Sequence, residues 1–398
     1  MSARRRRIVI VGGGFGGVKL ALQLARHQSK FKVTLISKYD FFEYHAALYR
    51  SATGWSPNEV VLPLTDIFTQ HTNIEVVVDE VRKIDAEAKQ VIGKSKTNYK
   101  YDDLVMAVGL TVNYFGVEGM AEQSYSLNTA KDSFKLRQHL RDAVITSHKT
   151  GEHLEFVVVG GGATGVELAS ELDFFLAELC SSENIGISRA HVSLVEGTSR
   201  LLSLLSPKAS KYAQWRLQKL GVKVMLKTKV TGLSNDKLKL EHGEIPSKTV
   251  IWTAGATNHL IFSKHPKIFT LARNGRVEID EYLRANKNIY VIGDNADTAY
   301  SGMAQTAISD ATFVAKNFVR STRGKKKKLY SPHQPIYAVP VGRDYAIVQW
   351  GRVVLRGRLA WLLRRVADLK LFMIFEPYRT AIKTWRSGNK RAKGFEVR

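Results

Sequence analysis

Two stretches of this chain carry the same short pattern: an apolar strand, then at once a glycine-rich turn, then a helix. The first is IVIVGGGFGGVKLALQLAR at residues 8–26, and the second is FVVVGGGATGVELASEL at residues 156–172. A run of apolar residues without alternation suits a parallel strand that is buried on both faces. The repeated unit therefore predicts an α/β chain with two separate parallel-sheet domains.

The glycine spacing predicts that each turn receives a phosphate-bearing ligand. In the pattern G-x-G-x-x-G the first glycine permits the tight turn, the second lets the backbone approach a pyrophosphate, and the third lets helix and strand pack closely. The free N–H groups and the dipole of the following helix then favour the phosphates. We predict two Rossmann-like dinucleotide-binding turns, rather than two ordinary strand–helix turns, at Gly12, Gly14, Gly17 and at Gly160, Gly162, Gly165.

An acidic residue at the end of the next strand distinguishes one dinucleotide from another, because it accepts hydrogen bonds from a ribose hydroxyl and repels a 2′-phosphate. In the second unit Glu196 ends the strand AHVSLVE, which favours NADH over NADPH, although Arg200 is close in sequence. In the first unit Ser37 and Lys38 stand at the matching place. The Ser37 hydroxyl can still bond a ribose, and Asp40 is the alternative acid.

Composition narrows the function classes. The chain has 398 residues, enough for two or three domains, and its single cysteine, Cys180, excludes an internal disulphide or a redox pair. No apolar run approaches the ~20 residues of a spanning helix, so we expect no proton pumping by the chain. The net charge of +24 fits nucleic acid, an anionic membrane surface or an acidic partner. Residues 351–398 carry thirteen lysines and arginines against three acids.

The order of motifs predicts four segments along the chain. Residues 1–120 form the first part of one dinucleotide domain, 121–272 an inserted second domain, 273–321 the return to the first domain, and 322–398 a small C-terminal domain. The phrases MAVG and WTAG each close a nucleotide domain. The phrase YVIGD reads as a strand with Gly293 and Asp294 after it, and MAQTAISDATFVAKNFV reads as the next helix.

These motifs together resemble the flavoproteins with two dinucleotide-binding domains, in which the first domain holds FAD and the inserted one holds NAD(P)H. The resemblance implies that Asp294 binds the ribityl chain, and it implies no metal. The implied FAD site comprises Gly12, Gly14, Phe15, Gly16, Gly17, Ser37, Lys38, Val81, Ala107, Gly109, Gly293, Asp294 and Ala304. The implied NADH site comprises Gly160, Gly162, Thr164, Gly165, Glu196 and Gly255.

Within that superfamily the chain resembles the type II NADH dehydrogenases, which are single-chain NADH:quinone oxidoreductases. Disulphide reductases and sulfide:quinone reductases need cysteines that this chain lacks. The segment FFEYHAALYRSATG resembles an aromatic segment of the type II family, and AQTAISDA resembles its quinone motif AQxAxQ, with Ser309 in place of the last glutamine. The resemblance implies transfer from NADH to FAD and then to a membrane quinone, with Gln305 at the quinone. We place Glu167 near the nicotinamide–flavin junction; the alternative is an acid that only the helix dipole favours.

The basic tail predicts two amphipathic helices separated by Pro377. Basic flanks beside leucine and tryptophan favour an interfacial position on anionic lipid, hence a peripheral (monotopic) protein on the cytoplasmic face of the cell membrane. The alternatives are packing on the chain's own core or on a partner in a homodimer. One face of the first helix carries Leu359, Leu362, Leu363, Val366, Leu369 and Met373, and the other carries Trp361, Arg364, Arg365 and Asp368.

Three rival functions remain open at this point. One is a soluble NAD(P)H-dependent flavin reductase that serves a small redox protein. Another is an FAD-binding protein whose basic surface binds nucleic acid, which is the less favoured reading. The third is a dehydrogenase of the same fold with a non-quinone organic acceptor. A membrane quinone reductase should be recovered from membranes only with detergent, whereas the first two alternatives should not need detergent.

Overall fold

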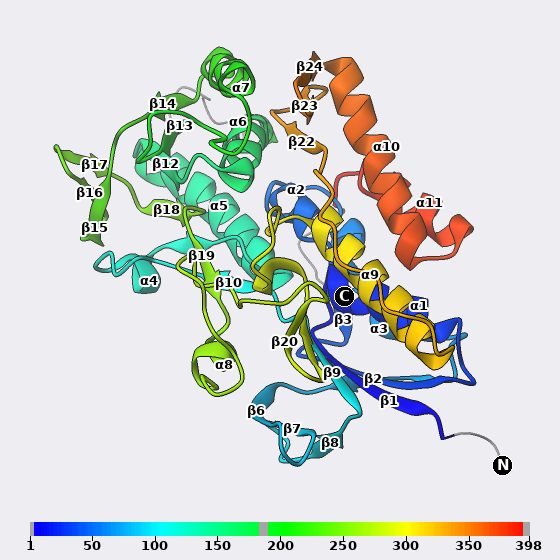
Figure 1. Cartoon of the computed structure of the whole chain (residues 1–398). Coiled ribbons are helices and arrows are strands. Elements are labelled where there is room, and N and C mark those ends of the chain that lie inside the picture. The colour runs from blue at the N-terminus through cyan, green and yellow to red at the C-terminus, as the bar shows by residue number, and fades with distance from the viewer. Residues whose placement is uncertain (1–3, 183–189, 393–398) are drawn as a thin grey trace.

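The computed structural model describes residues 4–182 and 190–392. Two parallel sheets, each built around one of the glycine turns, lie in different parts of the molecule (Figure 1), and the C-terminal segment contacts helices of both domains. The predicted α/β fold class is confirmed.

The first sheet contains the N-terminal glycine-turn unit near its centre. Its strand order is β20-β21-β9-β1-β2-β5, and all neighbours pair in parallel except β20 with β21. Ile8 and Ile10 point to one face and Val9 and Val11 to the other, and all four are at most 4% exposed, as an unalternating apolar run predicts. The strands are β1 (Arg6–Val11), β2 (Phe31–Ser37), β5 (Ile74–Val78), β9 (Asp103–Met106), β20 (Arg284–Asn286) and β21 (Ile289–Val291).

Different layers cover the two faces of the first sheet. The helices α1 (Phe15–Ala25) and α9 (Ala304–Thr322) pack against each other over one face. On the other face, Val9 and Met106 share a core cluster with side chains of a three-stranded antiparallel sheet. That sheet consists of β6 (Val81–Asp85), β7 (Gln90–Gly93) and β8 (Asn98–Lys100).

The second parallel sheet repeats this plan, with the order β11-β18-β12-β13-β14. Helices α5 (Ala130–Thr150), α6 (Ala163–Ser182) and α7 (Pro207–Lys219) belong to this domain, and a second antiparallel three-stranded sheet shares the core cluster on the other face. The parallel strands are β11 (Tyr125–Ser126), β12 (Leu154–Val159), β13 (Ala190–Val195), β14 (Lys223–Met225) and β18 (Thr249–Trp252). The antiparallel strands are β15 (Val230–Ser234), β16 (Lys237–Leu240) and β17 (Glu244–Pro246).

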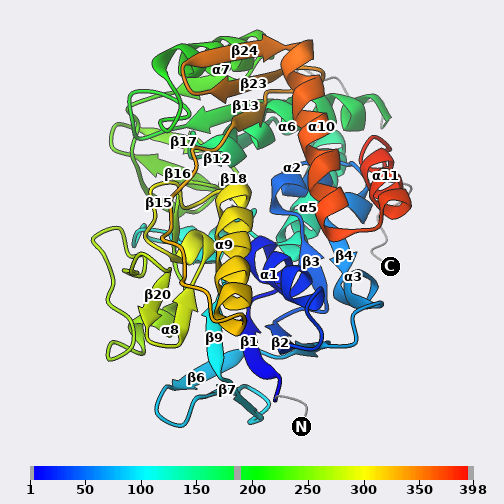
Figure 2. The same cartoon turned by 45° about the vertical axis from the view of Figure 1, so that its right-hand side comes forward.

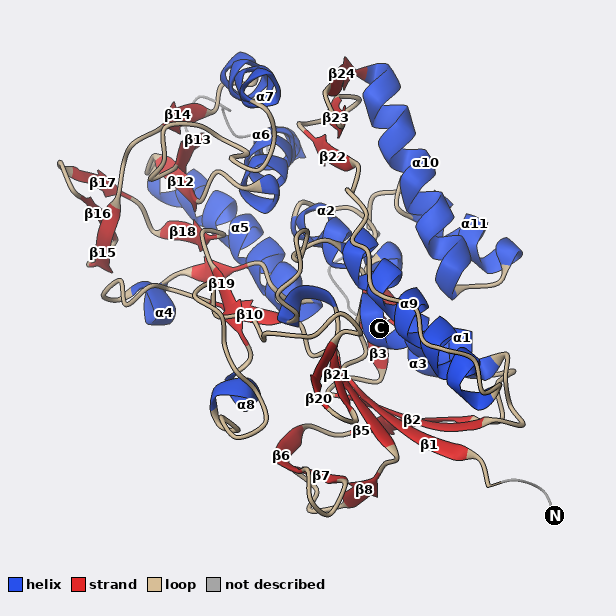
Figure 3. Cartoon of the chain, viewed as in Figure 1, coloured by secondary structure: helices blue, strands red, loops and turns tan. Residues whose placement is uncertain are grey.

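Two antiparallel strands join the domains, β10 (Leu110–Val112) on the way out and β19 (Ala256–Asn258) on the way back (Figure 3). The chain thus enters the second domain after β9 and returns to the first sheet at β20. The remaining short elements are β3 (Phe41–Glu43), β4 (Val61–Pro63), α2 (Leu48–Ala52), α3 (Leu64–Phe68), α4 (Met120–Gln123), α8 (Leu260–Ser263) and the 3-10 turns η1 (His45–Ala47), η2 (Pro57–Glu59) and η4 (Gly293–Asn295).

The C-terminal segment contains one strand more than the sequence indicates. The two expected strands are β22 (Tyr337–Pro340) and β23 (Ala346–Trp350), and a third, β24 (Val353–Gly357), pairs with β23. The sequence predicts this stretch to be the start of the basic tail because Arg352 and Arg356 flank and interrupt the short alternation of Val353 and Leu355. The two expected helices follow as α10 (Arg358–Phe375) and α11 (Tyr378–Ser387).

Helix α10 is packed with its charged side inward. Five of its apolar side chains are more than 40% exposed, whereas Arg365 and Asp368 are 3% and 4% exposed. In Figure 2 the helix runs along the outside of the molecule beside α11. The exposed side chains are Leu359, Leu362, Leu363, Val366 and Met373, which we call the apolar face of α10. These are five of the six side chains that the sequence pattern places on one face of the helix, and the sixth, Leu369, is half-buried.

Buried ion pairs attach α10 to the first domain. Arg365 lies 3.4 Å from Glu59 and 3.2 Å from Asp368, and Glu59 also pairs with Arg50. The Tyr44 hydroxyl donates to Asp368. The first domain and α10 are therefore joined through charges that would be costly to bury unpaired.

No helix in the described part of the chain is long and apolar enough to cross a membrane.

Candidate functional site

The first glycine turn has the geometry that a bound pyrophosphate requires. Gly12 has φ +117°, and a Cβ added there would lie 2.1 Å from the carbonyl oxygen of Ala107. A Cβ at Gly17 would lie 1.9 Å from the carbonyl oxygen of Gly12, so helix α1 starts in close contact with β1. At Gly14 nothing lies within 4 Å of the added atom. The middle glycine therefore borders open space at the N-terminus of α1, where phosphates bind.

The second turn reproduces this arrangement. Gly160 has φ +114°, and a Cβ added at Gly165 would lie 1.8 Å from the carbonyl oxygen of Gly160, while Gly162 again has nothing within 4 Å. Thr164, in the first turn of α6, is exposed beside this open side. The residues at both turns fit a dinucleotide.

A residue at the carboxyl end of the second parallel strand, β2 in the first domain and β13 in the second, lies against the glycine turn. Glu196 accepts hydrogen bonds from the N–H groups of Gly161 (2.6 Å) and Thr198 (2.7 Å). In the first domain Ser37 takes this place, since a Cβ at Gly13 would lie 2.3 Å from its hydroxyl oxygen. The acid of the second domain is thus fixed at the end of β13, where a ribose is read.

Arg200 is occupied elsewhere. Its guanidinium donates to the carbonyl oxygen of Leu205 at 2.6 Å and to the Ser210 hydroxyl at 2.9 Å. Arg200 therefore stabilises the loop that contains it. This removes the main argument, left open by the sequence, that Arg200 binds the 2′-phosphate of NADPH.

Asp294 lies in η4, directly after β21. One carboxylate oxygen accepts from the Gly302 N–H at 3.1 Å, and burial raises the pKa of the Asp294 carboxyl. Arg276 donates to the Asp294 carbonyl oxygen at 3.1 Å. Asp294 sits on the same edge of the first sheet as the glycine turn, because β21, β9 and β1 are parallel neighbours. This location fits a carboxylate that binds the flavin's ribityl chain.

The other residues of the expected FAD site gather around this edge. Phe15 packs against the rings of Phe42 (5.0 Å between centroids) and Tyr44 (5.9 Å). Lys38 is exposed, whereas the Val81 side chain is buried in the core at the start of β6. Four more members of the expected FAD site lie near the turn or α9, namely Gly16, Ala107, Gly293 and Ala304. A Cβ added at Gly16 would contact Ile292, and one added at Gly293 would contact Ala307.

Sequence reasoning missed two side chains that fix this edge. Asn295 is fully buried, and its amide both accepts from the N–H and donates to the carbonyl oxygen of Gly109. Asp310, on α9, accepts from the Gly293 N–H at 2.9 Å, and burial raises its pKa to about 6. Asn295 directly follows the GD pair, and its polarity beside a buried strand is the signal that could have identified it.

Glu167 lies on α6 where all three parts of the chain meet. It is 9% exposed, and burial raises its pKa to about 8, while Arg364 of α10 opposes this shift and Asp368 adds to it. Tyr49 of α2 is a further buried neighbour whose pKa is raised, first by burial and also by the Glu167 charge. The carboxyl is therefore largely protonated at neutral pH and can give a proton.

Gln305, in the first turn of α9, is bonded to the segment before β22. Its amide nitrogen donates to the Ile336 carbonyl oxygen at 2.8 Å, and its oxygen accepts from the Ile336 N–H at 3.1 Å. Both ends of the amide are thus used inside the protein. The side chain holds the start of the C-terminal domain against α9, a positioning contact that the motif alone does not reveal.

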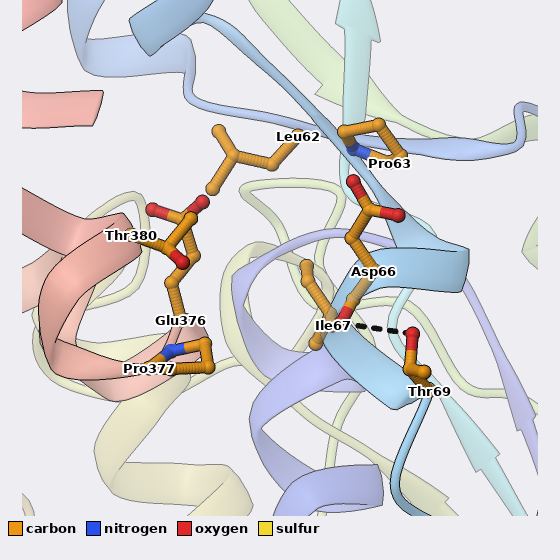
Figure 4. A pocket seen from close by; sticks show the side chains of 8 residues that line it. All are labelled: Leu62, Pro63, Asp66, Ile67, Thr69, Glu376, Pro377 and Thr380. Carbon is orange, nitrogen blue, oxygen red and sulfur yellow. Dashed lines mark hydrogen bonds between the residues drawn. The ribbon is translucent and has the colours of Figure 1, made fainter. Parts of the chain in front are cut away.

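A pocket of about 260 Å³ separates α3 from the junction of α10 and α11 (Figure 4). Asp66 and Thr69 line one side, and Glu376 and Thr380 line the other. Burial, and next Asp66, raise the pKa of Glu376, which accepts from Thr384. None of the expected cofactor or catalytic residues lines this pocket.

The family comparison defines the class of protein. Residues 6–311 match the model of the pyridine nucleotide-disulphide oxidoreductase family. Since this match covers well over half of the chain, the protein belongs to that family of two-domain flavin- and nicotinamide-dependent enzymes. Cys180, the chain's single cysteine, is buried in α6, so an internal disulphide is not the electron acceptor.

Individual relatives narrow the class. The chain is 28% identical over 412 residues to the type II NADH:quinone oxidoreductase Ndh of Mycobacterium tuberculosis, covering 96% of this chain and 88% of that protein. It is 26% identical over 391 residues to the type II NADH:quinone oxidoreductase of Staphylococcus epidermidis, covering 93% and 96%. In fold it is similar to NDH2 from Plasmodium falciparum in complex with NADH, with a TM-score of 0.88, 19% identity and coverage of 97% and 98%.

Replacing Glu196 with glutamine should relax the preference for NADH. Glutamine keeps an oxygen that accepts from Gly161 but removes the charge that repels a 2′-phosphate, an effect worth about 1 kcal/mol in bulk water and about 4 kcal/mol near a protein surface. We expect the ratio of kcat/KM for NADPH to that for NADH to rise about tenfold. Glu122→Gln, an exposed acid on α4, is the control. Equal kcat/KM for the two donors in the wild-type protein would contradict the assignment.

Proposed function

We infer that this protein is a type II NADH:quinone oxidoreductase, which oxidises NADH through FAD and reduces a quinone. The carrying observation is one chain with two complete dinucleotide turns and a single, buried cysteine. Such a chain has a site for a flavin and a site for its donor, but no disulphide to pass electrons through. The extent of the likeness to type II enzymes, over nearly the whole chain, supports the same conclusion.

FAD, when bound, accepts two electrons and a proton from NADH and passes two electrons on. The chain's own residues orient the two partners. Gly14 and Gly162 leave room for the two pyrophosphates, and Glu196 selects the ribose of the donor. Asp294 and the hydrogen-bonded pair of Asn295 and Gly109 lie at the same edge of the sheet as the glycine turn and complete the proposed flavin site.

Quinol formation takes two electrons and two protons, and NADH supplies only one of those protons. We assign the second proton to Glu167, whose pKa of about 8 keeps it protonated at neutral pH. The carboxyl lies beside α10, the helix that also carries the apolar face, so this proton donor adjoins the C-terminal segment. Gln305 then acts as a positioning residue, through its two bonds to Ile336.

A membrane quinone is dissolved in the bilayer, and we propose that the apolar face of α10 contacts the bilayer. The exposed leucine, valine and methionine side chains lie on a helix whose charged side is buried, and a contiguous apolar patch of this kind is typical of contact with a membrane or another protein. The helix pair also carries exposed cations, such as Lys370 and Arg379, which suit anionic lipid. The proposed location is the cytoplasmic face of the cell membrane. A second copy of the chain is the alternative cover for this face.

The β23–β24 turn extends the same surface. Cross-strand partners share a face of a sheet, and Val348 pairs with Leu355 while Trp350 pairs with Val353. Val348 packs with Ala360 of α10, so Trp350 (70% exposed) and Val353 (57%) stand on the α10 side. The proposed membrane surface therefore includes a tryptophan at its edge, a position that tryptophan favours at lipid interfaces.

Steady-state oxidation of NADH by the purified protein tests the function. With a short-chain quinone as acceptor we expect turnover of at least 1 s⁻¹, with one NADH consumed for each quinone. A small ferredoxin-type protein is the comparison acceptor. Faster turnover with that protein than with any quinone would support the alternative of a soluble reductase. A preparation that binds no FAD would refute the proposed flavin-dependent reaction.

A further inference from the structure

Phe115 is an exposed aromatic side chain in an unusual backbone conformation. Its φ is +52°, in the left-handed region, and its side chain is 63% exposed. An Asx turn holds it there, since the Phe115 N–H donates to the Asn113 side chain at 2.8 Å. Bulky residues avoid this conformation. A strained residue that gains no burial in return is a candidate for a binding role.

The ring lies against the predicted NADH site. A Cβ added at Gly255 would be 2.4 Å from the Phe115 ring and 2.5 Å from the Asn113 carbonyl oxygen. The Asn113 N–H donates to the Gly255 carbonyl oxygen at 3.1 Å, and the Trp252 indole donates to the Asn113 carbonyl oxygen at 2.9 Å. Two hydrogen bonds and the close approach of the Phe115 ring to Gly255 thus fix the loop, which follows β10, onto the end of β18.

The topology places this loop on one particular side of the glycine turn. Glu196 follows β13, on one side of β12, whereas Gly255 follows β18 on the other side. A dinucleotide lies across the carboxyl ends of such strands, with its adenosine at the acid and its second nucleoside over the opposite strands. The Phe115 ring therefore stands where the nicotinamide half must lie.

We propose that the Phe115 ring is a wall of the nicotinamide subsite, against which the nicotinamide of NADH packs. The inference deepens the proposed function and rests on it. The strained loop presents the ring before the ligand arrives, so no ordering is needed on binding. Phe115 is therefore a residue that positions the donor, separate from the phosphate-binding turn and from Glu196.

Binding of NAD⁺ and of ADP-ribose to the FAD-loaded protein tests the proposal by calorimetry. ADP-ribose keeps both phosphates and both riboses but lacks the nicotinamide ring. For Phe115→Ala we expect the Kd of NAD⁺ to rise about three- to tenfold, the usual range for losing one aromatic contact, with the Kd of ADP-ribose unchanged. Phe115→Tyr should behave as the wild type. Leu329→Ala removes an apolar side chain of matched exposure, 64%, and should change neither Kd.

Two results would overturn the proposal: an unchanged Kd for NAD⁺ in Phe115→Ala, or an equal weakening of NAD⁺ and ADP-ribose. Phe115→Leu, which keeps an apolar side chain on the loop, repeats the comparison if the alanine variant loses FAD or melts early. Failure of the proposed function would look different. In that case the wild-type protein itself would bind no NAD⁺, and NADH would not bleach its flavin under anaerobic conditions.

Discussion

Serine at Leu362, Leu363 and Val366 will release the protein from anionic vesicles without harming its reaction with NADH. These side chains are 43–52% exposed, so their removal leaves the folded core intact. Each forfeits about 1 kcal/mol of apolar transfer, or roughly 3 kcal/mol in all. Vesicle binding, measured by sedimentation, should weaken about 100-fold, and turnover with a long-tailed quinone should fall with it. Anaerobic bleaching of the flavin by NADH should proceed at the wild-type rate.

A matched triple variant is the control for this experiment. Leu260, Leu271 and Leu329 are 66%, 39% and 64% exposed on other surfaces, and serine at these three positions should change neither binding nor turnover. Unaltered vesicle binding of the α10 variant would refute the membrane assignment. A change from dimer to monomer in detergent-free solution, with vesicle binding intact, would identify the apolar face as a subunit contact.

Deleting the C-terminal helices is a poorer test, for a structural reason. Phe372 and Phe375 are 0% and 2% exposed, and Phe375 contacts Phe42 and Phe15 of the first domain. Removal of α10 would also break the ion pair between Arg365 and Glu59, although Glu59 would keep its pair with Arg50. Truncation would therefore confuse loss of membrane contact with loss of the fold.

Replacing Glu167 with glutamine should separate the two halves of the reaction. Quinone-dependent kcat is expected to fall about 100-fold, the usual contribution of a general acid, while flavin reduction by NADH stays within about twofold. Glu171→Gln is the matched control, because Glu171 is a buried carboxyl one turn along α6 that accepts from the Trp55 indole. Equal losses in both variants would show that packing, and not proton supply, explains the effect.

The same substitution should alter the pH dependence of stability. Burial raises the pKa of Glu167 from 4.5 to about 8. Between these values the unfolded chain loses the proton and the folded chain keeps it, so this carboxyl makes the protein less stable as pH rises from 4.5 to 8. The cost reaches roughly 3–5 kcal/mol. Glu167→Gln should therefore have a Tm close to that of the wild type at pH 5 and a higher Tm at pH 8. Parallel Tm curves would contradict the buried, protonated state.

The sequence predicts those parts of the fold that depend on local patterns. Both glycine turns, the strands before them and the break at Pro377 follow from spacing and turn chemistry alone. The ribose role of Glu196 stays a prediction, but its position against the turn follows from its fixed interval after the glycines. The resemblance to the type II family likewise depended on short, contiguous motifs.

What the sequence could not reveal depends on contacts between distant residues. The periodicity of α10 defines two faces, but the burial of its charged face depends on Glu59, which is 306 residues away from Arg365. The raised pKa of Glu167 needs the same helix beside it. Phe115 gave no signal, because its left-handed backbone arises from the Asn113 turn and the contact with Gly255. Gln305 matched a motif, yet its bonds to Ile336 appear only in three dimensions.

The outward apolar side of α10 also has a kinetic consequence. A helix of 18 residues is about 27 Å long, and together with the β23–β24 turn it would rest lengthwise on lipid, so that the molecule keeps a fixed tilt. NADH would then arrive by diffusion in three dimensions, while the quinone arrives in two. For such an enzyme the effective acceptor concentration is the quinone's mole fraction in the bilayer, not its amount per litre. Extra lipid without extra quinone would slow the reaction through surface dilution, even though every molecule of enzyme and acceptor remained in the tube.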